Sequence, residues 1–528
     1  MVSDGFSVAR TDSQGRYSLK TCEDTYYIYY SVPADCEVAR NGYNQPAFFT
    51  KYSSEQSVYD FTLTKLAGGV EEQFSLFVLA DPQVRSGANY NASYPEIEYF
   101  RDETVPAVNT HIETRKGEGM PCYGVVLGDI VYSEYNGRYP KDAPNTVHLM
   151  DDMRDEMKNI SIPLFQTIGN HDYTYFDENT SIDSEKVWPG TSHQIKAQRA
   201  FEDVFGPINY SWNRGDAHII NMRNVYFKSE TDAGDYVMGF TDEQYEWLKN
   251  DLQFVPLDKL IIFCVHIPVW NRSGSSYPNG ANVINLLRRY PNLRILSGHN
   301  HYMRYRECYT DVKEHTLAAV CGAWWSSKTN GDGAPNGYGV FDINGTAVDN
   351  YYYMSSNGAD DAARRDNQIR LYRGNLKCGN TSNDNYYQLQ HGEGVILANV
   401  FNGCSGAGWT IKIYENDTPY DMEYVTEKVY QPGGTNNIAV PSWSIFGGYS
   451  PVNVPTDSNQ DWWAIGYRAC IEGLSGAASF VNCFHMYKHT IQDTSATIRV
   501  EATDPYGRTY VQTDILENGD DIYASIER

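Results

Sequence analysis

Side chains of the types that bind metal ions follow five apolar, strand-like runs in the middle of the chain. In chain order these endings are Asp81-Pro82-Gln83, Gly128-Asp129, Gly169-Asn170-His171-Asp172, His266 and Gly298-His299-Asn300-His301. Ligands of open α/β sheets bind at the carboxyl ends of the strands, so we expect the five clusters to meet at one sheet edge. One such ending is weak evidence, but packing alone does not explain five in succession.

These clusters supply seven ligand-type side chains, which are Asp81, Gln83, Asp129, Asn170, His266, His299 and His301. Their oxygen and nitrogen donors, without a thiolate, favour Mn²⁺, Fe or Zn²⁺ over copper or an iron–sulfur centre. Seven ligands exceed the needs of one four-coordinate metal and suit two divalent metal ions that share a bridging carboxylate. Two metals ~3.5–4 Å apart stabilise both oxygens of a phosphoryl displacement, with a bridging hydroxide as the nucleophile.

The order of the motifs resembles the calcineurin-like metallophosphoesterase superfamily, whose pattern is D-x-H, G-D, G-N-H-[DE], H and G-H-x-H. The match covers about residues 73–345. The flanking regions resemble the β modules of secreted or periplasmic bacterial members, including the segment from Asp332 to Tyr338 (DGAPNGY). The resemblance implies a layered α/β core, a β-sandwich flanked by helices, that acts as a phosphodiesterase or phosphatase outside the cytoplasm.

The resemblance also implies a role for each matching residue. One metal is surrounded by Asp81, Gln83, Asp129 and His301, and the other by Asp129, Asn170, His266 and His299, with Asp129 as the bridge. His171 protonates the leaving alkoxide or binds a phosphoryl oxygen, and Asp172 orients the His171 imidazole. We expect no cofactor other than the metals.

Two residues raise questions about the metals. Gln83 stands where most of the family has His, and its amide oxygen is a neutral, harder and weaker donor than imidazole. We therefore expect weaker binding at the first site and a preference for Mn²⁺ over Zn²⁺. Tyr132 completes a G-D-x-x-Y pattern that resembles purple acid phosphatases, whose Tyr binds Fe(III). The rest of that pattern is missing, and Asp172 replaces its Glu, so we favour an aromatic side chain packed beside the site.

Further residues have two interpretations each. Trp324 and Trp325 either form a wall of a substrate pocket or pack in the core, and the sequence favours neither. Arg214 and Arg223 flank a predicted strand and are candidates to reach a phosphate, although the sequence does not place them.

His485 and His489 have the spacing of two metal ligands on one face of a helix. Their surroundings have a β pattern and lack a third ligand, so we predict that both are surface residues.

The residue pattern divides the chain into three predicted domains. Residues 1–66 alternate short strand-like runs, including 58–63, with turns, which predicts a small β-sandwich-like domain. Residues 73–357 alternate strands with helices, which predicts the layered α/β catalytic domain. Residues 368–528 return to short strands and predict a second all-β domain after a linker at 355–367.

Two predicted helices have clear sequence signals. Residues 147–160 place Met150, Met153 and Met157 at three- and four-residue intervals, which indicates a core-facing stripe rather than a binding face. Thr241 followed by Gln244 predicts a capping box at the start of another helix.

Composition excludes several classes of protein. The chain has 528 residues, a net charge of −25, and 41% apolar and 14% aromatic residues, which rules out a disordered protein. The longest apolar run of the catalytic region is far shorter than the ~20 residues that span a bilayer. The ten cysteines lack C-x-x-C and zinc-finger spacing, which argues against a structural zinc site. The chain opens without a signal peptide, which leaves open whether an upstream segment was removed.

The acidic balance and the lack of basic runs argue against a nucleic-acid partner. We therefore predict a metal-dependent phosphohydrolase that cleaves phosphate mono- or diesters of a small molecule. The alternative is an extracytoplasmic carbohydrate- or surface-binding protein with a vestigial metal site. A vestigial site loses several ligands, whereas here one of seven departs, and it is replaced by another donor. A protein Ser/Thr phosphatase fits poorly because the similarity stops at the metal motifs. The oligomeric state stays open.

Overall fold

In a computed structural model, the protein folds into two compact units. The residues that it describes are 1–84, 96–132, 149–173, 193–229, 234–269, 276–308, 312–322, 324–325, 328–380, 385–425, 452–454, 460–470 and 482–520. The first unit comprises Met1–His299, Glu307–His315 and Gly339–Tyr351, and the second comprises Asn300–Arg306, Thr316–Tyr338 and Tyr352–Arg528.

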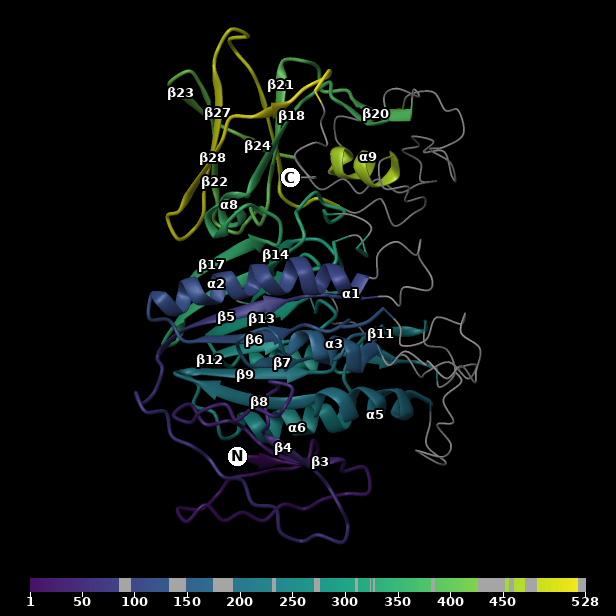
Figure 1. Cartoon of the computed structure of the whole chain (residues 1–528), viewed down its shortest axis with the longest axis vertical. Helices are drawn as coiled ribbons and strands as arrows, with labels where there is room; N and C mark the ends of the chain where they lie inside the picture. Colours follow the sequence, from purple (N-terminus) through teal and green to yellow (C-terminus); the bar gives the residue numbers. More distant parts are fainter. Residues whose placement is uncertain are drawn as a thin grey trace. The chain divides into compact units, whose positions relative to one another are not determined.

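The first unit contains most of a five-stranded sheet of order β17-β16-β5-β6-β7, of which Figure 1 labels β5, β6, β7 and β17. Its strands are β5 (Gln73–Leu79), β6 (Cys122–Val126), β7 (Leu164–Gln166), β16 (Gly337–Asn344) and β17 (Ala347–Ser355). The first three are parallel and almost entirely buried, because both faces of a parallel sheet are covered. Between β5 and β6 the chain forms α1 (Glu96–Tyr99), the π-helix η1 (Phe100–Thr104) and α2 (Val105–Gly117), and α2 packs on β6.

A second sheet of six strands has the order β14-β15-β13-β12-β9-β8. Its strands are β8 (Asn209–Arg214), β9 (Ala217–Met222), β12 (Leu260–Cys264), β13 (Asn292–Ser297), β14 (Arg304–Cys308) and β15 (Val312–Thr316). Strand β12 lies parallel to both β9 and β13. The chain between β9 and β13 also contains β10 (Val225–Phe227), β11 (Tyr236–Met238), α6 (Asp242–Leu252) and α7 (Gly280–Leu287). Alternating strands and helices thus form the predicted layered α/β core.

Both sequence signals for helices are confirmed. Helix α3 (Leu149–Met157) buries Met150, Met153 and Met157, so the methionine stripe faces the core. At the start of α6, the Thr241 side chain accepts a hydrogen bond from the Gln244 N–H at 3.2 Å. The Gln244 side chain in turn accepts one from the Thr241 N–H at 3.0 Å.

The N-terminal residues form a small antiparallel sheet of order β2-β1-β3-β4 that belongs to the first unit. Its strands are β1 (Val2–Ser3), β2 (Val8–Ala9), β3 (Tyr27–Tyr30) and β4 (Phe49–Lys51). The strand predicted at 58–63 is wrong: the segment pairs with no neighbouring strand, and although Tyr59 is buried, Val58 is 63% exposed. The domain boundaries inferred from the sequence stay predictions.

The second unit consists mainly of three further sheets, with orders β24-β26-β21-β18-β29, β23-β22-β27-β28 and β19-β20-β25. Their strands are β18 (Ile369–Arg373), β19 (Lys377–Asn380), β20 (Asn385–Leu389), β21 (Val395–Val400), β22 (Thr410–Glu415), β23 (Thr418–Asp421), β24 (Glu423–Tyr424), β25 (Val452–Val454), β26 (Met486–Thr490), β27 (Ile498–Thr503), β28 (Thr509–Gln512) and β29 (Ile515–Leu516). Residues such as Leu371, Ile413 and Val500 form a shared apolar core.

Two helices lie in regions that the sequence predicted to be a linker and an all-β domain. The linker contains α8 (Asp361–Asp366), whose N-terminus is capped by the Asp360 side chain. Helix α9 (Trp462–Cys470) packs on β19 and β20. Within the described residues, no helix has the length and apolar character needed to cross a membrane.

Candidate metal centre

The strands that precede the predicted ligand clusters belong to two sheets rather than one. Strands β5, β6 and β7 lie in the five-stranded sheet, whereas β12 and β13 lie in the six-stranded sheet. The expectation of a single sheet edge is therefore wrong. Ligand residues of the first unit still meet across the two sheets: Asp129, after β6, lies beside His266, after β12, and Asp81, after β5, lies beside His299, after β13.

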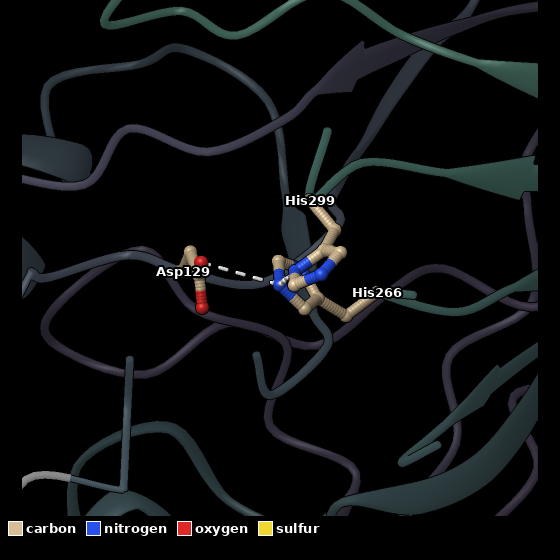
Figure 2. A group of neighbouring side chains, drawn as sticks. All are labelled: Asp129, His266 and His299. Atoms are coloured by element: carbon tan, nitrogen blue, oxygen red, sulfur yellow. Dashed lines mark hydrogen bonds and ion pairs between the residues drawn. The ribbon is translucent and has the colours of Figure 1, made fainter. Parts of the chain in front are cut away.

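Asp129, His266 and His299 form the centre of this meeting point (Figure 2). The His266 Nε2 atom lies 3.2 Å from Asp129 Oδ2 and 3.2 Å from His299 Nδ1. Asn170 Oδ1 lies 3.0 Å from the same nitrogen. One ring nitrogen carries at most one hydrogen and cannot satisfy three such neighbours. A cation that all these atoms coordinate relieves the crowding, so the residues fit a metal.

His266 is held in the orientation that a ligand needs. Its Nδ1 lies 2.8 Å from the Leu127 carbonyl, and donation to that oxygen leaves Nε2 for the metal. The Asn224 side chain accepts hydrogen bonds from the backbone N–H groups of His266 and Ile267. Burial lowers the pKa of His266, but the adjacent Asp129 carboxylate raises it to about 9. Sequence reasoning missed Asn224, since no motif marks it and only the fold brings it to His266.

Asp129 is buried and its carboxylate is ionised. Burial raises its pKa, but the neighbouring His266 and His171 outweigh this and lower the pKa below its usual range. Its Oδ1 accepts the His171 N–H at 2.8 Å. A Cβ on Gly169 would lie 2.2 Å from that oxygen, so only glycine permits this approach.

Asp81 and Gln83 lie beside this group. Both Asp81 oxygens lie 2.9 Å from the His299 N–H, and burial raises the pKa of the Asp81 carboxyl to about 8. The Gln83 amide nitrogen donates to Asp129 Oδ2 at 3.2 Å. Its buried Oε1 has no hydrogen-bond partner among the described residues. An oxygen that is buried without a partner next to two carboxylates is suited to a metal ion.

His301 follows His299 by two residues and belongs to the second unit. Its Nδ1 lies 3.0 Å from the Gly322 carbonyl, so its Nε2 is the nitrogen left for a ligand. Its ring packs against Trp324, with the ring centroids 5.2 Å apart. Trp325 is buried, whereas Trp324 is half-buried, so the pocket-wall interpretation stays open for Trp324 alone.

The expected orientation of His171 by Asp172 is wrong. The His171 Nδ1 instead lies 2.8 Å from the Tyr132 carbonyl, and its ring stacks on the Tyr132 ring at 4.6 Å. The packing of Tyr132 beside the site is thus confirmed. Asp172 is buried and accepts three backbone N–H groups, from Gly169, Ile130 and Val131. It therefore ties the loop after β7 to the loop after β6, and burial raises its pKa to about 7.

The two arginines considered as phosphate ligands make structural contacts. Arg214 is fully buried and donates to the carbonyl oxygens of Ala34 and Cys36. Arg223 donates to the side-chain oxygens of Gln198 and Gln244.

Comparisons with known proteins cover most of the chain. Residues 78–303 match the family described as "Calcineurin-like phosphoesterase". Residues 1–66 and 314–438 match the descriptions "N terminal of Calcineurin-like phosphoesterase" and "C terminal of Calcineurin-like phosphoesterase". No curated protein matches the sequence.

Several solved structures are similar over about half of the chain. A dimetal phosphatase from Danio rerio is 17% identical, with 54% of this chain and 99% of that chain covered and a TM-score of 0.34. A purple acid phosphatase from yellow lupin (Lupinus luteus) is 15% identical, with 54% and 52% covered and a TM-score of 0.33. A 5'-nucleotidase from Candida albicans is 14% identical, with the same coverage of 54% and 52% and a TM-score of 0.33.

Proposed function

Because the chain belongs to the calcineurin-like phosphoesterase family, with that family's N- and C-terminal domains on either side of its core, we propose that it hydrolyses phosphate mono- or diesters of small molecules. The observation that carries this proposal is the convergence of Asp129, Asn170 and His299 on one nitrogen of His266. A group of ligands this crowded is suited to a metal ion and to little else.

We propose that two metals are held by the seven predicted ligands. Asp129, Asn170, His266 and His299 hold one metal. Asp81, Gln83, Asp129 and, from its place in the motif, His301 hold the other. When bound, the metals make a water molecule nucleophilic near neutral pH and stabilise the charge on the transferred phosphoryl group. Mn²⁺ is favoured, because oxygen donors and the Gln83 amide outnumber the imidazoles.

His171 is the proposed proton donor to the leaving oxygen. Its Nδ1 donates to the Tyr132 carbonyl, which leaves Nε2 to face a substrate, and its ring is half-buried. Tyr132 stacks on one face of this ring and limits its rotation. Asp172 acts through the backbone, because it fixes the loops that carry Asp129 and Asn170 and does not contact the imidazole.

The charge of the protein favours a small substrate. A net charge of −25 repels long polyanions, whereas a compact phosphate ester experiences mainly the local positive charge of the metals. A location outside the cytoplasm rests on the family resemblance alone and stays a prediction.

Hydrolysis by metal-stripped protein tests the proposal. A chromogenic phosphodiester and the matching monoester are supplied with and without Mn²⁺, while bound metal is measured in parallel. Turnover that depends on Mn²⁺ supports the hydrolase, and the ratio of the two rates identifies the ester class. If no metal binds, the proposal fails and the binding protein with a vestigial site becomes the better explanation.

A further inference from the structure

The second unit contains a buried polar cluster next to the segment that carries His301. We call it the Asp332 cluster, and its members are Asp332, Tyr372, Asn399, Asp461 and His485, all of them buried. Asp332 belongs to the DGAPNGY segment noted in the sequence, and His485 lies immediately before β26. The prediction that His485 is a surface residue is wrong.

Asp332 holds the backbone that follows His301. Its Oδ2 accepts the Met303 N–H at 2.7 Å, and its Oδ1 accepts the Ala334 N–H at 3.1 Å. Met303 comes two residues after His301, and its side chain is buried in an apolar cluster with Ala334 and Phe401. The carboxylate thus restrains the chain immediately after the predicted ligand.

His485 and Asn399 in turn hold Asp332. The Asn399 amide nitrogen donates to the Asp332 carbonyl at 2.7 Å and to Asp461 Oδ2 at 2.6 Å. Its oxygen therefore faces His485 Nδ1, at 2.6 Å, while His485 Nε2 lies 3.0 Å from Asp332 Oδ2. Both ring nitrogens of His485 therefore lie within hydrogen-bond distance of an oxygen atom, one on Asn399 and one on Asp332.

The same segment also restrains the His301 ring. The ring is oriented by the Gly322 carbonyl, and a Cβ on Gly322 would lie 2.0 Å from the Asn336 side-chain oxygen. Asn336 follows Asp332 by four residues. The segment 332–336 therefore makes two contacts near His301. Asp332 holds the backbone after His301, and Asn336 packs against Gly322, whose carbonyl orients the His301 imidazole.

We propose that Asp332, held by His485 and Asn399, is a positioning residue that presents His301 to its metal. This inference rests on the proposed function, since it takes His301 to be a ligand. It assigns the predicted C-terminal domain (368–528) the task of keeping one metal ligand in place, because Asn399 and His485 both lie in that range. Outer hydrogen bonds to metal ligands typically change metal affinity 10–100-fold when they are removed.

Mn²⁺ titration of the full chain, followed by electron paramagnetic resonance of the free ion, tests the proposal. We expect D332N and H485Q to weaken one of the two sites by ~10–100-fold and to leave the other unchanged. The matched control is H489Q, because His489 lies on β26 and its Nε2 lies 2.9 Å from Glu415 Oε1. That change removes another histidine–carboxylate pair of the same unit without touching Asp332, and we expect normal Mn²⁺ affinity.

Coupling to His301 separates positioning from general destabilisation. We expect H301A to remove the same Mn²⁺ site, and D332N to have no further effect on Mn²⁺ binding in the H301A protein. Excess Mn²⁺ should restore the turnover of D332N, but not that of H301A. Circular dichroism and unfolding temperature verify that each variant is folded, and H485Q serves if D332N does not fold.

The proposal is overturned if folded D332N and H485Q bind Mn²⁺ like the unmodified protein. It is also overturned if H489Q weakens Mn²⁺ binding as much as D332N does. The same holds if D332N weakens Mn²⁺ binding further in the H301A protein. If the protein binds two Mn²⁺ ions but hydrolyses no ester, the proposed function is contradicted, and the positioning role is supported when D332N and H485Q still weaken one site. A protein that binds no Mn²⁺ contradicts both.

Discussion

Two buried polar clusters of this protein use the same residue types and differ in how their hydrogen bonds are satisfied. In the Asp332 cluster, both nitrogens of His485 and both oxygens of Asp332 have partners of opposite character. In the metal centre, three ligand atoms crowd His266 Nε2, and Gln83 Oε1 has no hydrogen-bond partner within the described residues. The first cluster is complete as it stands, and the second needs a cation.

The backbone shows the same difference. Asp81, Asp129 and His299 have φ angles of 48°, 49° and 71°, in the left-handed region that residues other than glycine rarely adopt. Asp332 and His485 are not among the described residues with positive φ. Strain of this kind persists where the surrounding structure enforces it, and it concentrates at functional sites. Histidine–aspartate proximity alone therefore does not identify a metal site, whereas crowding with backbone strain does.

The largest expected effect is the loss of the metal centre in D129A. One carboxylate serves both proposed metals, so we expect metal binding and hydrolysis to disappear together. Metal content and turnover, measured on the same preparation, check this outcome. Retained activity would contradict the two-metal arrangement.

H171A distinguishes binding from chemistry within the metal centre. His171 contacts Tyr132 and Asp129 through its own polar groups but is not a proposed ligand. We expect turnover to fall by ~10²–10⁴-fold with unchanged metal content, which is typical for the loss of a general acid. Normal turnover would remove His171 from the mechanism.

Matched truncations in the metal-free protein compare the two clusters directly. We expect H485A to destabilise the second unit by about 3 kcal/mol, because it removes the imidazole that lies between the buried side-chain oxygens of Asp332 and Asn399. H299A should cost only about 1 kcal/mol, since its cluster is not satisfied without a metal. Urea unfolding with chelator present measures both values. Equal losses of unfolding free energy in the two variants would contradict the difference between the clusters.

His315 supplies a third and smaller case, a histidine buried among aromatic rings. It contacts Phe341 and Tyr351, and burial, with help from Arg294 and Lys313, lowers its pKa to about 3. The unfolded chain binds a proton near pH 6.5, whereas the folded protein does not. This contribution to stability is therefore complete well above that pH and falls as the pH decreases, by about 1.4 kcal/mol at pH 5.5. H315Q lacks this titrating group, so its stability should not show this dependence on pH. The difference between the urea unfolding midpoints of the unmodified protein and H315Q should therefore decrease from pH 7 to pH 5.

Local sequence signals predicted the elements that depend on local physics. The capping box of Thr241 and Gln244 and the methionine stripe of α3 were correct, since both follow from helix geometry. The strand at 58–63 was wrong, because β-propensity does not show whether a partner strand exists. The family resemblance implied that Asp172 orients His171, but the Asp172 carboxylate accepts the Ile130 N–H and the His171 ring contacts the Tyr132 carbonyl.

By itself, the sequence determined the family and the donor types, because metal chemistry restricts which side chains can serve and in what order they follow strands. The tertiary structure alone decided that two sheets contribute those strands, that Asn224 supports His266, and that Tyr132 rather than Asp172 contacts the His171 imidazole. It also decided that His485 is buried against Asp332, 153 residues away. Contacts at such separations depend on which surfaces pack together, and no local pattern records that choice.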